Sequence, residues 1–209
     1  MNVLLIHGMG RTPASMLWLR HRLRADGHRV GLFGYSPTFE SLERVTGRLV
    51  RRVRRMAGSG AYALVGHSLG TVLIRNALED LQDQPPEACF FLAPPVTASQ
   101  AAKLCSRFWL FRAATGEMGQ LLANDDFMRQ LPMPDPVHIY AGTGGPRRDW
   151  LPLGDVPNDG IVTLAEACGR VPEAAREVDA MHTFIMNNAQ VIADIRRQLS
   201  RLEGKTEPA

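Results

Sequence analysis

The chain has 209 residues, of which 45% are hydrophobic and 22% charged, a composition typical of a globular protein. This length is short for two full domains, so we expect one domain with a single large core. The 24 lysines and arginines exceed the 21 aspartates and glutamates by only three, a charge balance that gives no sign of nucleic-acid binding. Three cysteines are an odd number in a chain this large, and reduced thiols are expected.

The first residues of the chain are apolar and predict a buried strand. They lack the basic stretch and the small-residue cleavage site of a secretory signal. No window has the roughly 20 apolar residues that cross a bilayer. We therefore expect a cytoplasmic protein.

Apolar stretches of strand length alternate with segments of helical periodicity along the chain. This alternation is typical of βαβ units and predicts the α/β class, with a parallel sheet. Fully apolar strand cores indicate helices on both faces of that sheet. The predicted strands, six in all and mostly parallel, are 3–6, 30–35, 61–65, 88–92, 137–141 and 175–178, and the predicted helices are 13–26, 41–56, 71–82, 164–168 and 189–201.

Neither an internal repeat nor a low-complexity linker divides the chain. We therefore expect a single domain over residues 1–202, in which 93–136 forms a long, partly helical segment. The polar residues 203–209 end in Pro-Ala and are expected to be a frayed tail.

One predicted helix is rich in arginine. Its apolar residues recur at three- and four-residue spacing, so one stripe is expected to pack on the sheet while the arginines face water. The alternative is that these arginines bind an acidic partner or a phospholipid surface. No aromatic residues alternate with them to stack on bases, which disfavours a nucleic-acid partner. The arginines are Arg44, Arg48, Arg51, Arg52, Arg54 and Arg55.

The run Gly66-His67-Ser68-Leu69-Gly70 stands between a predicted strand and a predicted helix. A sharp strand-to-helix turn strains its central residue, and a glycine on each side removes the Cβ atoms that would clash. Ser68 is thereby expected to stand exposed at the carboxyl edge of the sheet as a nucleophile. The alternative is a glycine-rich turn with an idle serine.

A serine nucleophile needs donors for the negative charge that develops on the substrate carbonyl oxygen. The run His7-Gly8-Met9-Gly10 follows the first predicted strand and can turn backbone amides toward that charge. The amide of Leu69 lies at the start of the helix after Ser68. We predict that Met9 and Leu69 form the oxyanion hole.

The serine also needs a base. His182 follows the last predicted strand, in a loop expected at the carboxyl edge of the sheet. Its position late in the chain, after the serine and the acid, makes it the predicted base.

The five other histidines have other expected places. His21 and His28 are expected at the surface, and His138 is expected to be a buried, hydrogen-bonded structural residue. His7 is expected to orient the loop before the first helix, and His67 to point away from Ser68.

The acid that orients the base is expected between the serine and the histidine in the chain. Asp159 stands in the run Pro157-Asn158-Asp159-Gly160-Ile161-Val162, a tight turn that would fix a carboxylate rigidly. Asp159 is therefore the predicted acid, and Asp155 is its rival. Asp149 adjoins two arginines and is expected in a surface ion pair.

Together these four motifs resemble the α/β-hydrolase superfamily, in particular its small bacterial lipases and esterases, along nearly the whole chain. The resemblance implies an open parallel sheet and cleavage of carboxylic esters by Ser68, His182 and Asp159. It also implies that a lid or cap follows the strand after the helix that begins behind Ser68, here residues 93–136. That segment is too short for a folded cap domain, so we expect short or medium acyl chains. The apolar residues of the segment, which either line the acyl pocket or pack on the sheet, are Phe108, Trp109, Leu110, Phe111, Leu121, Leu122, Phe127 and Met128.

The substrate class stays open within these expectations. A thioesterase, a lipid deacylase and an acyltransferase use the same triad, and a non-catalytic binding module can keep the same fold. The expected ligand is a small acyl ester or a lipid. No cofactor or metal is expected, because Gly142-Thr143-Gly144-Gly145 lacks the dinucleotide pattern and no metal-ligand spacing occurs. No cationic cluster is expected at the site.

Overall fold

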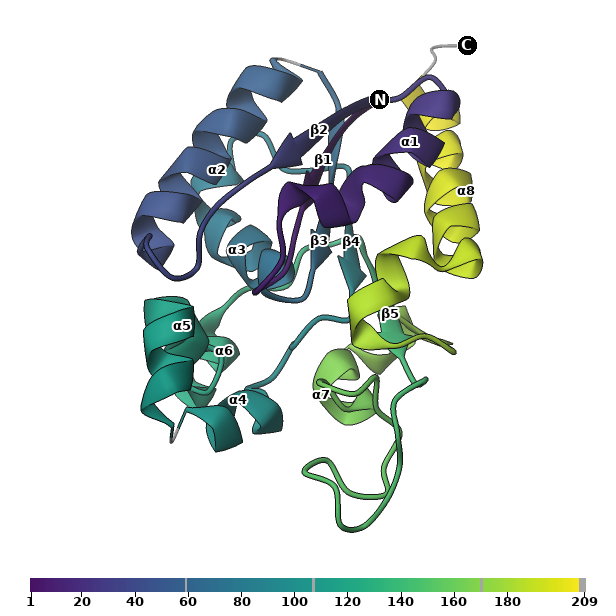
Figure 1. The fold of residues 1–209 in the computed structure, drawn as a ribbon. Coiled ribbons are helices and arrows are strands. Elements are labelled where there is room, and N and C mark those ends of the chain that lie inside the picture. The colour runs from purple at the N-terminus through teal and green to yellow at the C-terminus, as the bar shows by residue number, and fades with distance from the viewer. Residues whose placement is uncertain (59, 107, 170, 207–209) are drawn as a thin grey trace.

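The computed structural model describes residues 1–58, 60–106, 108–169 and 171–206 and shows one central sheet with helices on both sides (Figure 1). The strand order is β2-β1-β3-β4-β5-β6, and each neighbouring pair is parallel. The predicted α/β class with six parallel strands is confirmed. The strands are β1 (Asn2–Ile6), β2 (Arg29–Phe33), β3 (Tyr62–His67), β4 (Ala88–Leu92), β5 (Val137–Gly142) and β6 (Ala175–Val178).

Short 3-10 turns (η) accompany the helices. The predicted helix 13–26 begins as such a turn, and the predicted helix 71–82 begins earlier, directly after Ser68, and stops at Ala77. No helix in the described part of the chain is long and apolar enough to cross a membrane. The helical elements are η1 (Pro13–Met16), α1 (Leu17–Ala25), α2 (Leu42–Ala57), α3 (Leu69–Ala77), η2 (Glu79–Leu81), α4 (Gln100–Cys105), α5 (Trp109–Leu121), α6 (Asp125–Gln130), α7 (Leu164–Cys168), η3 (Pro172–Ala174), η4 (His182–Asn187) and α8 (Ala189–Thr206).

Each face of the sheet packs against its own helices because alternate strand residues point to opposite sides. In β1, Leu4 and Ile6 belong to the core under α2 and α3, whereas Val3 and Leu5 belong to the core under α1 and α8. Figure 1 shows these two helix pairs on opposite sides of the strands. All residues of β3 and β4 are buried, as expected for central parallel strands.

Helix α2 carries the arginine run. Its residues Leu42, Val45, Leu49 and Val53 are buried in the core. Arg44, Arg51, Arg54 and Arg55 are exposed, while Arg48 is half-buried and pairs with Glu40. The structure thus agrees with a helix that packs one stripe and leaves most of its arginines in water.

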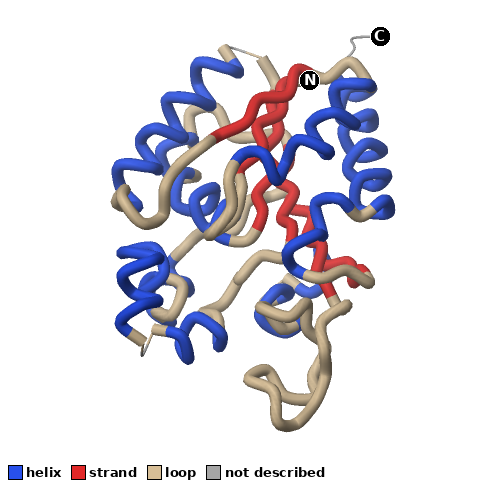
Figure 2. The backbone as a smooth tube through the Cα atoms, in the orientation of Figure 1, coloured by secondary structure: helices blue, strands red, loops and turns tan. Residues whose placement is uncertain are grey.

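The segment between β4 and β5 forms α4, α5 and α6, which lie together beyond the carboxyl end of β4 in the lower left of Figure 2. Arg75 fixes this segment to α3. Its side chain is buried and donates hydrogen bonds to the carbonyl oxygens of Val96, Met128, Leu131 and Pro132 at 2.8–3.0 Å. The helices that cover the carboxyl edge are therefore held by a buried guanidinium.

The end of the chain differs from the expected frayed tail. Helix α8 continues to Thr206, and Leu202 packs against the core under α1 and α8. Glu203 pairs with the N-terminal ammonium group and with Nδ1 of His28, the latter at 3.1 Å. The expectation of an exposed His28 is also wrong, because this residue is only 4% exposed and its ring contacts Glu203 of α8. Residues 207–209 of the expected tail lie outside the described residues.

Candidate active site

Ser68 occupies the turn between β3 and α3, as the strand-turn-helix prediction requires. Its backbone has φ 50° and ψ −120°, a left-handed conformation that typically costs a residue other than glycine about 1–3 kcal/mol. Gly66 and Gly70 make the turn sterically feasible. A Cβ on Gly66 would lie 2.9 Å from the carbonyl carbon of Gly70, and one on Gly70 would lie 2.5 Å from the carbonyl oxygen of Ile6.

The loop after β1 lies directly against this turn. A Cβ on Gly8 would lie 3.0 Å from Cβ of Ser68 and 2.7 Å from Nδ1 of His67, so only glycine fits there without displacing a neighbour. Met9 follows and lines the same cavity as Ser68. The amide of Leu69 is the first of α3 and has no intrahelical acceptor. The structure thus brings both predicted oxyanion residues beside Ser68.

His7 fixes the loop after β1 through contacts with Gly8 and Tyr35. Its Nδ1 donates to the carbonyl oxygen of Gly8 at 2.9 Å, and its ring stacks on Tyr35 with centroids 4.4 Å apart. The Tyr35 hydroxyl donates in turn to the carbonyl oxygen of His7 at 2.9 Å. Burial lowers the pKa of His7 below its ordinary value, so the ring is neutral at pH 7. These contacts agree with the predicted loop-orienting role.

His182 and Asp159 form a buried pair. Nδ1 of His182 donates to Oδ2 of Asp159 at 2.7 Å, and the two side chains are 7% and 1% exposed. Oδ1 of Asp159 accepts from the amides of Ile161 and Val162 at 2.9 and 2.7 Å. The His182 amide also donates to the carbonyl oxygen of Asp159 at 2.9 Å. The carboxylate is therefore fixed from both sides and holds the imidazole with Nε2 free of Asp159.

The tight turn that positions Asp159 depends on Asn158, which sequence reasoning noted only as part of the run. Asn158 is buried, and its Nδ2 donates to the carbonyl oxygens of Pro146 and Val156 while its Oδ1 accepts from the Gly160 amide. Asp155, the rival acid, is exposed, and no hydrogen bond or ion pair between it and His182 is present among the described residues. The geometry therefore favours Asp159.

His67 has a role that the sequence did not indicate. Its Nε2 donates to the carbonyl oxygen of His182 at 3.0 Å, and the two rings lie 5.0 Å apart. Its other nitrogen, Nδ1, is buried and has no hydrogen-bond partner among the described residues. Burial, with His182 nearby, holds the pKa of His67 well below its ordinary value, which keeps the ring neutral. A histidine next to the nucleophile in a G-x-S-x-G run was the available signal, but its partner lies 115 residues away.

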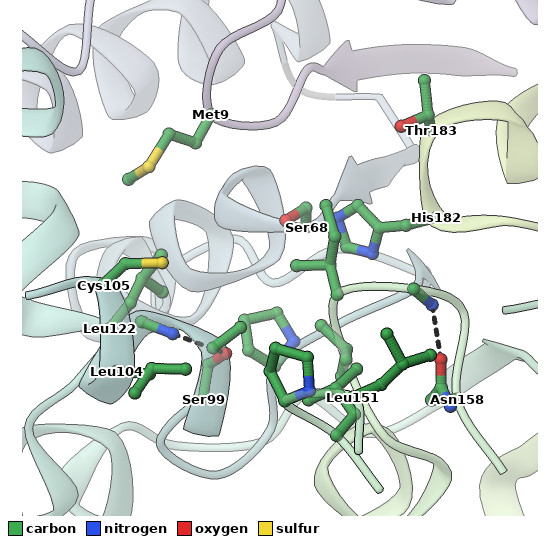
Figure 3. A pocket seen from close by; sticks show the side chains of 18 of the residues that line it. Met9, Ser68, Ser99, Leu104, Cys105, Leu122, Leu151, Asn158, His182 and Thr183 are labelled. Carbon is green, nitrogen blue, oxygen red and sulfur yellow. Dashed lines mark hydrogen bonds between the residues drawn. The ribbon is translucent and has the colours of Figure 1, made fainter. Parts of the chain in front are cut away.

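Ser68 and His182 line one cavity of about 500 Å³, and Figure 3 shows them next to each other. No hydrogen bond between Ser68 Oγ and the His182 ring is present among the described residues. Such contacts are often long before substrate binds. Within the described chain, no group of three or more histidine, cysteine or acidic side chains is arranged to hold a metal ion.

The walls of this cavity are mostly apolar. The cap segment supplies Leu104, Cys105 and Leu122 on one side, and Leu151 faces them from the loop after β5 (Figure 3). Of the apolar cap residues singled out from the sequence, Leu122 lines the cavity, Leu121, Phe127 and Met128 pack on the core, and Phe108 and Trp109 are exposed. The side chains of Leu110 and Phe111 lie outside the described residues. The expected apolar wall therefore has contributions from the cap and from the loop after β5.

Solved structures with this fold include several hydrolases. A lipase of Bacillus licheniformis, BlEst2, is 17% identical with a TM-score of 0.66 over 95% of this chain and 91% of its own. RedJ, the thioesterase of the prodiginine biosynthetic pathway in Streptomyces coelicolor, is 14% identical with a TM-score of 0.60 over 96% and 85%. A putative hydrolase of Xanthomonas campestris is 15% identical with a TM-score of 0.62 over 96% and 98%. At these identities the likeness shows the fold.

A family model matches nearly the whole chain. No curated protein matches the chain. The model of the alpha/beta hydrolase family matches residues 3–202, which include the loop 7–10, the turn around Ser68, Asp159 and His182. The chain therefore belongs to the alpha/beta hydrolase family.

Proposed function

We propose that this protein is a serine hydrolase that cleaves carboxylic esters through an acyl-enzyme on Ser68. The observation that carries the proposal is the buried His182–Asp159 pair, with its 2.7 Å hydrogen bond, on the same cavity as the strained Ser68. In this assignment Ser68 is the nucleophile, His182 the base and Asp159 the residue that fixes the imidazole tautomer.

The reaction follows from the positions of these groups. Nε2 of His182 takes the proton of the Ser68 hydroxyl as Oγ attacks the ester carbonyl carbon. The amides of Met9 and Leu69 stabilise the resulting oxyanion, each donor being worth about 3 kcal/mol. Collapse of the tetrahedral intermediate expels the alcohol, which takes the proton from His182. Water then attacks the acyl-enzyme by the same route and releases the acid.

The cavity supports short or medium acyl chains. A volume of about 500 Å³ lies within the usual range for small-molecule sites, and its apolar walls suit a hydrocarbon chain. The strained backbone of Ser68 also argues against a non-catalytic module, because such a module gains nothing from this conformation.

A thioester is the second candidate substrate. RedJ, a thioesterase, shares the fold with a TM-score of 0.60. Thioesters are cleaved by the same nucleophile, base and oxyanion donors, so the triad alone does not separate the two substrates.

The proposal is tested by hydrolysis of p-nitrophenyl esters from acetate to palmitate by wild-type and Ser68→Ala protein. Activity with a short- or medium-chain optimum that vanishes in Ser68→Ala would support the proposal. Labelling of wild-type protein by a fluorophosphonate, followed by peptide mapping to Ser68, supplies a readout that does not depend on the acyl group. Labelling without ester turnover would favour the thioester. The absence of both labelling and turnover would refute a serine hydrolase.

A further inference from the structure

Arg11 is the charged residue of the cavity. Arg11 lies two residues after Met9 in the chain and is half-buried. It lines the cavity together with Ser68 and His182. Among the described lining residues it is the sole lysine, arginine, aspartate or glutamate. No sequence pattern predicts a cation at this place, because Arg11 stands alone and the clustered arginines lie on α2.

The protein uses little of the hydrogen-bonding capacity of Arg11. Its backbone amide closes the turn onto the carbonyl oxygen of Gly8 at 3.3 Å, and Nη2 donates to the carbonyl oxygen of Thr183 at 3.2 Å. A guanidinium has five N–H donors. No ion pair of the described residues includes Arg11, and Asp159, the acid behind His182, is already bonded to a histidine and two amides.

A cation in this position has a specific electrostatic consequence. Charges interact more strongly beside an apolar wall than in bulk water, because the local dielectric constant is lower. Arg11 is also one of the groups that lower the pKa of the buried His67 ring, so its field reaches the inner wall beside Ser68. The cavity thus combines apolar walls for a hydrocarbon with one positive charge near the reacting atoms.

We propose that Arg11 binds an anionic group, a carboxylate or a phosphate, on the substrate, so that the preferred esters are acidic ones. The planar guanidinium offers paired N–H donors that match the oxygens of both groups. Because Arg11 belongs to the loop that carries the oxyanion donor Met9, the anion would lie close to the scissile ester. This inference rests on the proposed hydrolase function and adds the substrate class.

Another role for Arg11 is purely structural. Its bond to Thr183 joins the oxyanion loop to the residue after His182. A structural tie would affect all substrates alike, whereas an anion site changes the ratio between acidic and neutral substrates. The ratio is therefore the quantity to measure.

The experiment uses two matched pairs of esters. Methyl hydrogen adipate and methyl hexanoate place the charge on the acyl side, and 4-carboxyphenyl butyrate and 4-carbamoylphenyl butyrate place it on the leaving group. We expect wild-type protein to favour the acidic member of one pair by about ten- to a hundredfold in kcat/KM, as for a hydrogen bond to a charged group. Arg11→Gln should bring that ratio close to one, Arg11→Lys should keep part of it, and 0.5 M salt should reduce it.

Arg148→Gln is the matched control, because Arg148 is an exposed arginine on the loop after β5 and should leave the ratio unchanged. The proposal is overturned if wild-type protein shows no acidic preference in either pair, or if Arg11→Gln keeps the wild-type ratio. Calorimetric binding of the same four esters to Ser68→Ala protein separates the two proposals. Tighter binding of an acidic member that depends on Arg11, without turnover by wild-type protein, would refute the hydrolase function alone.

Discussion

His67 donates a hydrogen bond from Nε2 to the backbone carbonyl oxygen of His182 at 3.0 Å. The bond joins the end of β3, directly before the proposed nucleophile Ser68, to the start of η4, which carries the proposed base. His67 is 2% exposed, so water does not compete for the bond. Asp159 fixes the imidazole of His182 on the other side. The backbone and the ring of His182 are thus held by two different elements.

We predict that His67→Met lowers kcat about tenfold, with little change in KM. The variant leaves the His182 carbonyl without its donor, and a loss of about 1–1.5 kcal/mol corresponds to that factor. His67→Gln keeps a donor near the position of Nε2 and should recover most of the rate. Steady-state kinetics with p-nitrophenyl butyrate measure both. Equal losses in the two variants, or a loss confined to KM, would contradict a positioning role.

Asp159→Asn should lower kcat by up to about 10⁴-fold while the protein stays folded. The asparagine oxygen can still accept from the amides of Ile161 and Val162, but its NH₂ group would then face Nδ1 of His182 and favour the wrong tautomer. Asp155→Asn is the control, because this carboxylate is exposed and should leave the rate within about twofold. If Asp155→Asn carries the larger loss, the acid has been misassigned.

Gly8→Ala should reduce kcat by about a hundredfold, the typical effect of losing one oxyanion donor. Its Cβ would lie 2.7 Å from Nδ1 of His67, whose ring is held by the bond to His182, so the loop and the Met9 amide must move instead. Gly47→Ala is a matched control in α2, where the new Cβ meets only the flexible end of Arg51 at 3.4 Å. The control should keep its activity and gain about 0.5–1 kcal/mol of stability from helix propensity. An active Gly8→Ala protein would show that Met9 is not an oxyanion donor.

The buried histidines predict a pH dependence of stability. Burial lowers the pKa of His7, and burial with nearby His182 lowers that of His67, from an ordinary value of 6.5. Below pH 6.5 the unfolded chain binds protons that the folded protein does not, so the free energy of unfolding decreases as the pH falls. Above pH 6.5 the two histidines do not lower the free energy of unfolding. Below pH 6.5 this free energy falls by up to about 1.4 kcal/mol per pH unit for each histidine.

Urea denaturation at pH 7.5 and 5.5 measures this loss. The carboxyl groups with lowered pKa, among them Asp194 and Glu203, have ordinary values of 3.8 and 4.5, so they titrate below this window. His67→Gln should show a smaller loss between the two pH values than wild-type protein. An identical loss would mean that His67 is not a neutral buried group.

Much of the fold could be predicted because it depends on local patterns. Strands 88–92 and 175–178 and helix 164–168 have the predicted bounds, since each is a short apolar or capped segment between clear turn signals. The turn around Ser68 could be predicted for the same reason, because strand, glycines and helix are contiguous. The burial of His28 could not, since it depends on an extension of α8 that packs Leu202 onto the core. The bond between His67 and His182 likewise requires two segments 115 residues apart to meet.

Arg75 is the clearest residue whose role appears only in three dimensions. In the sequence it is a polar residue of a helix, whereas in the structure it is 1% exposed beneath the cap segment. Its guanidinium satisfies the carbonyl oxygens of Val96, Met128 and Leu131 among others. Buried backbone oxygens left without donors are costly, so the cap depends on this side chain.

We predict that Arg75→Met lowers the free energy of unfolding by at least about 3 kcal/mol, because the apolar replacement leaves several buried carbonyl oxygens without a donor. Arg54→Met is the control, since Arg54 is exposed on α2 and its bonds to Asp83 are screened by water, so its loss should cost less than about 1 kcal/mol. Urea denaturation compares the two variants. The cap also lines the substrate cavity, so at a temperature where Arg75→Met remains folded its KM should rise more for butyrate and longer esters than for acetate. A change in stability without a change in this chain-length dependence would mean that the wall of the cavity keeps its shape without Arg75.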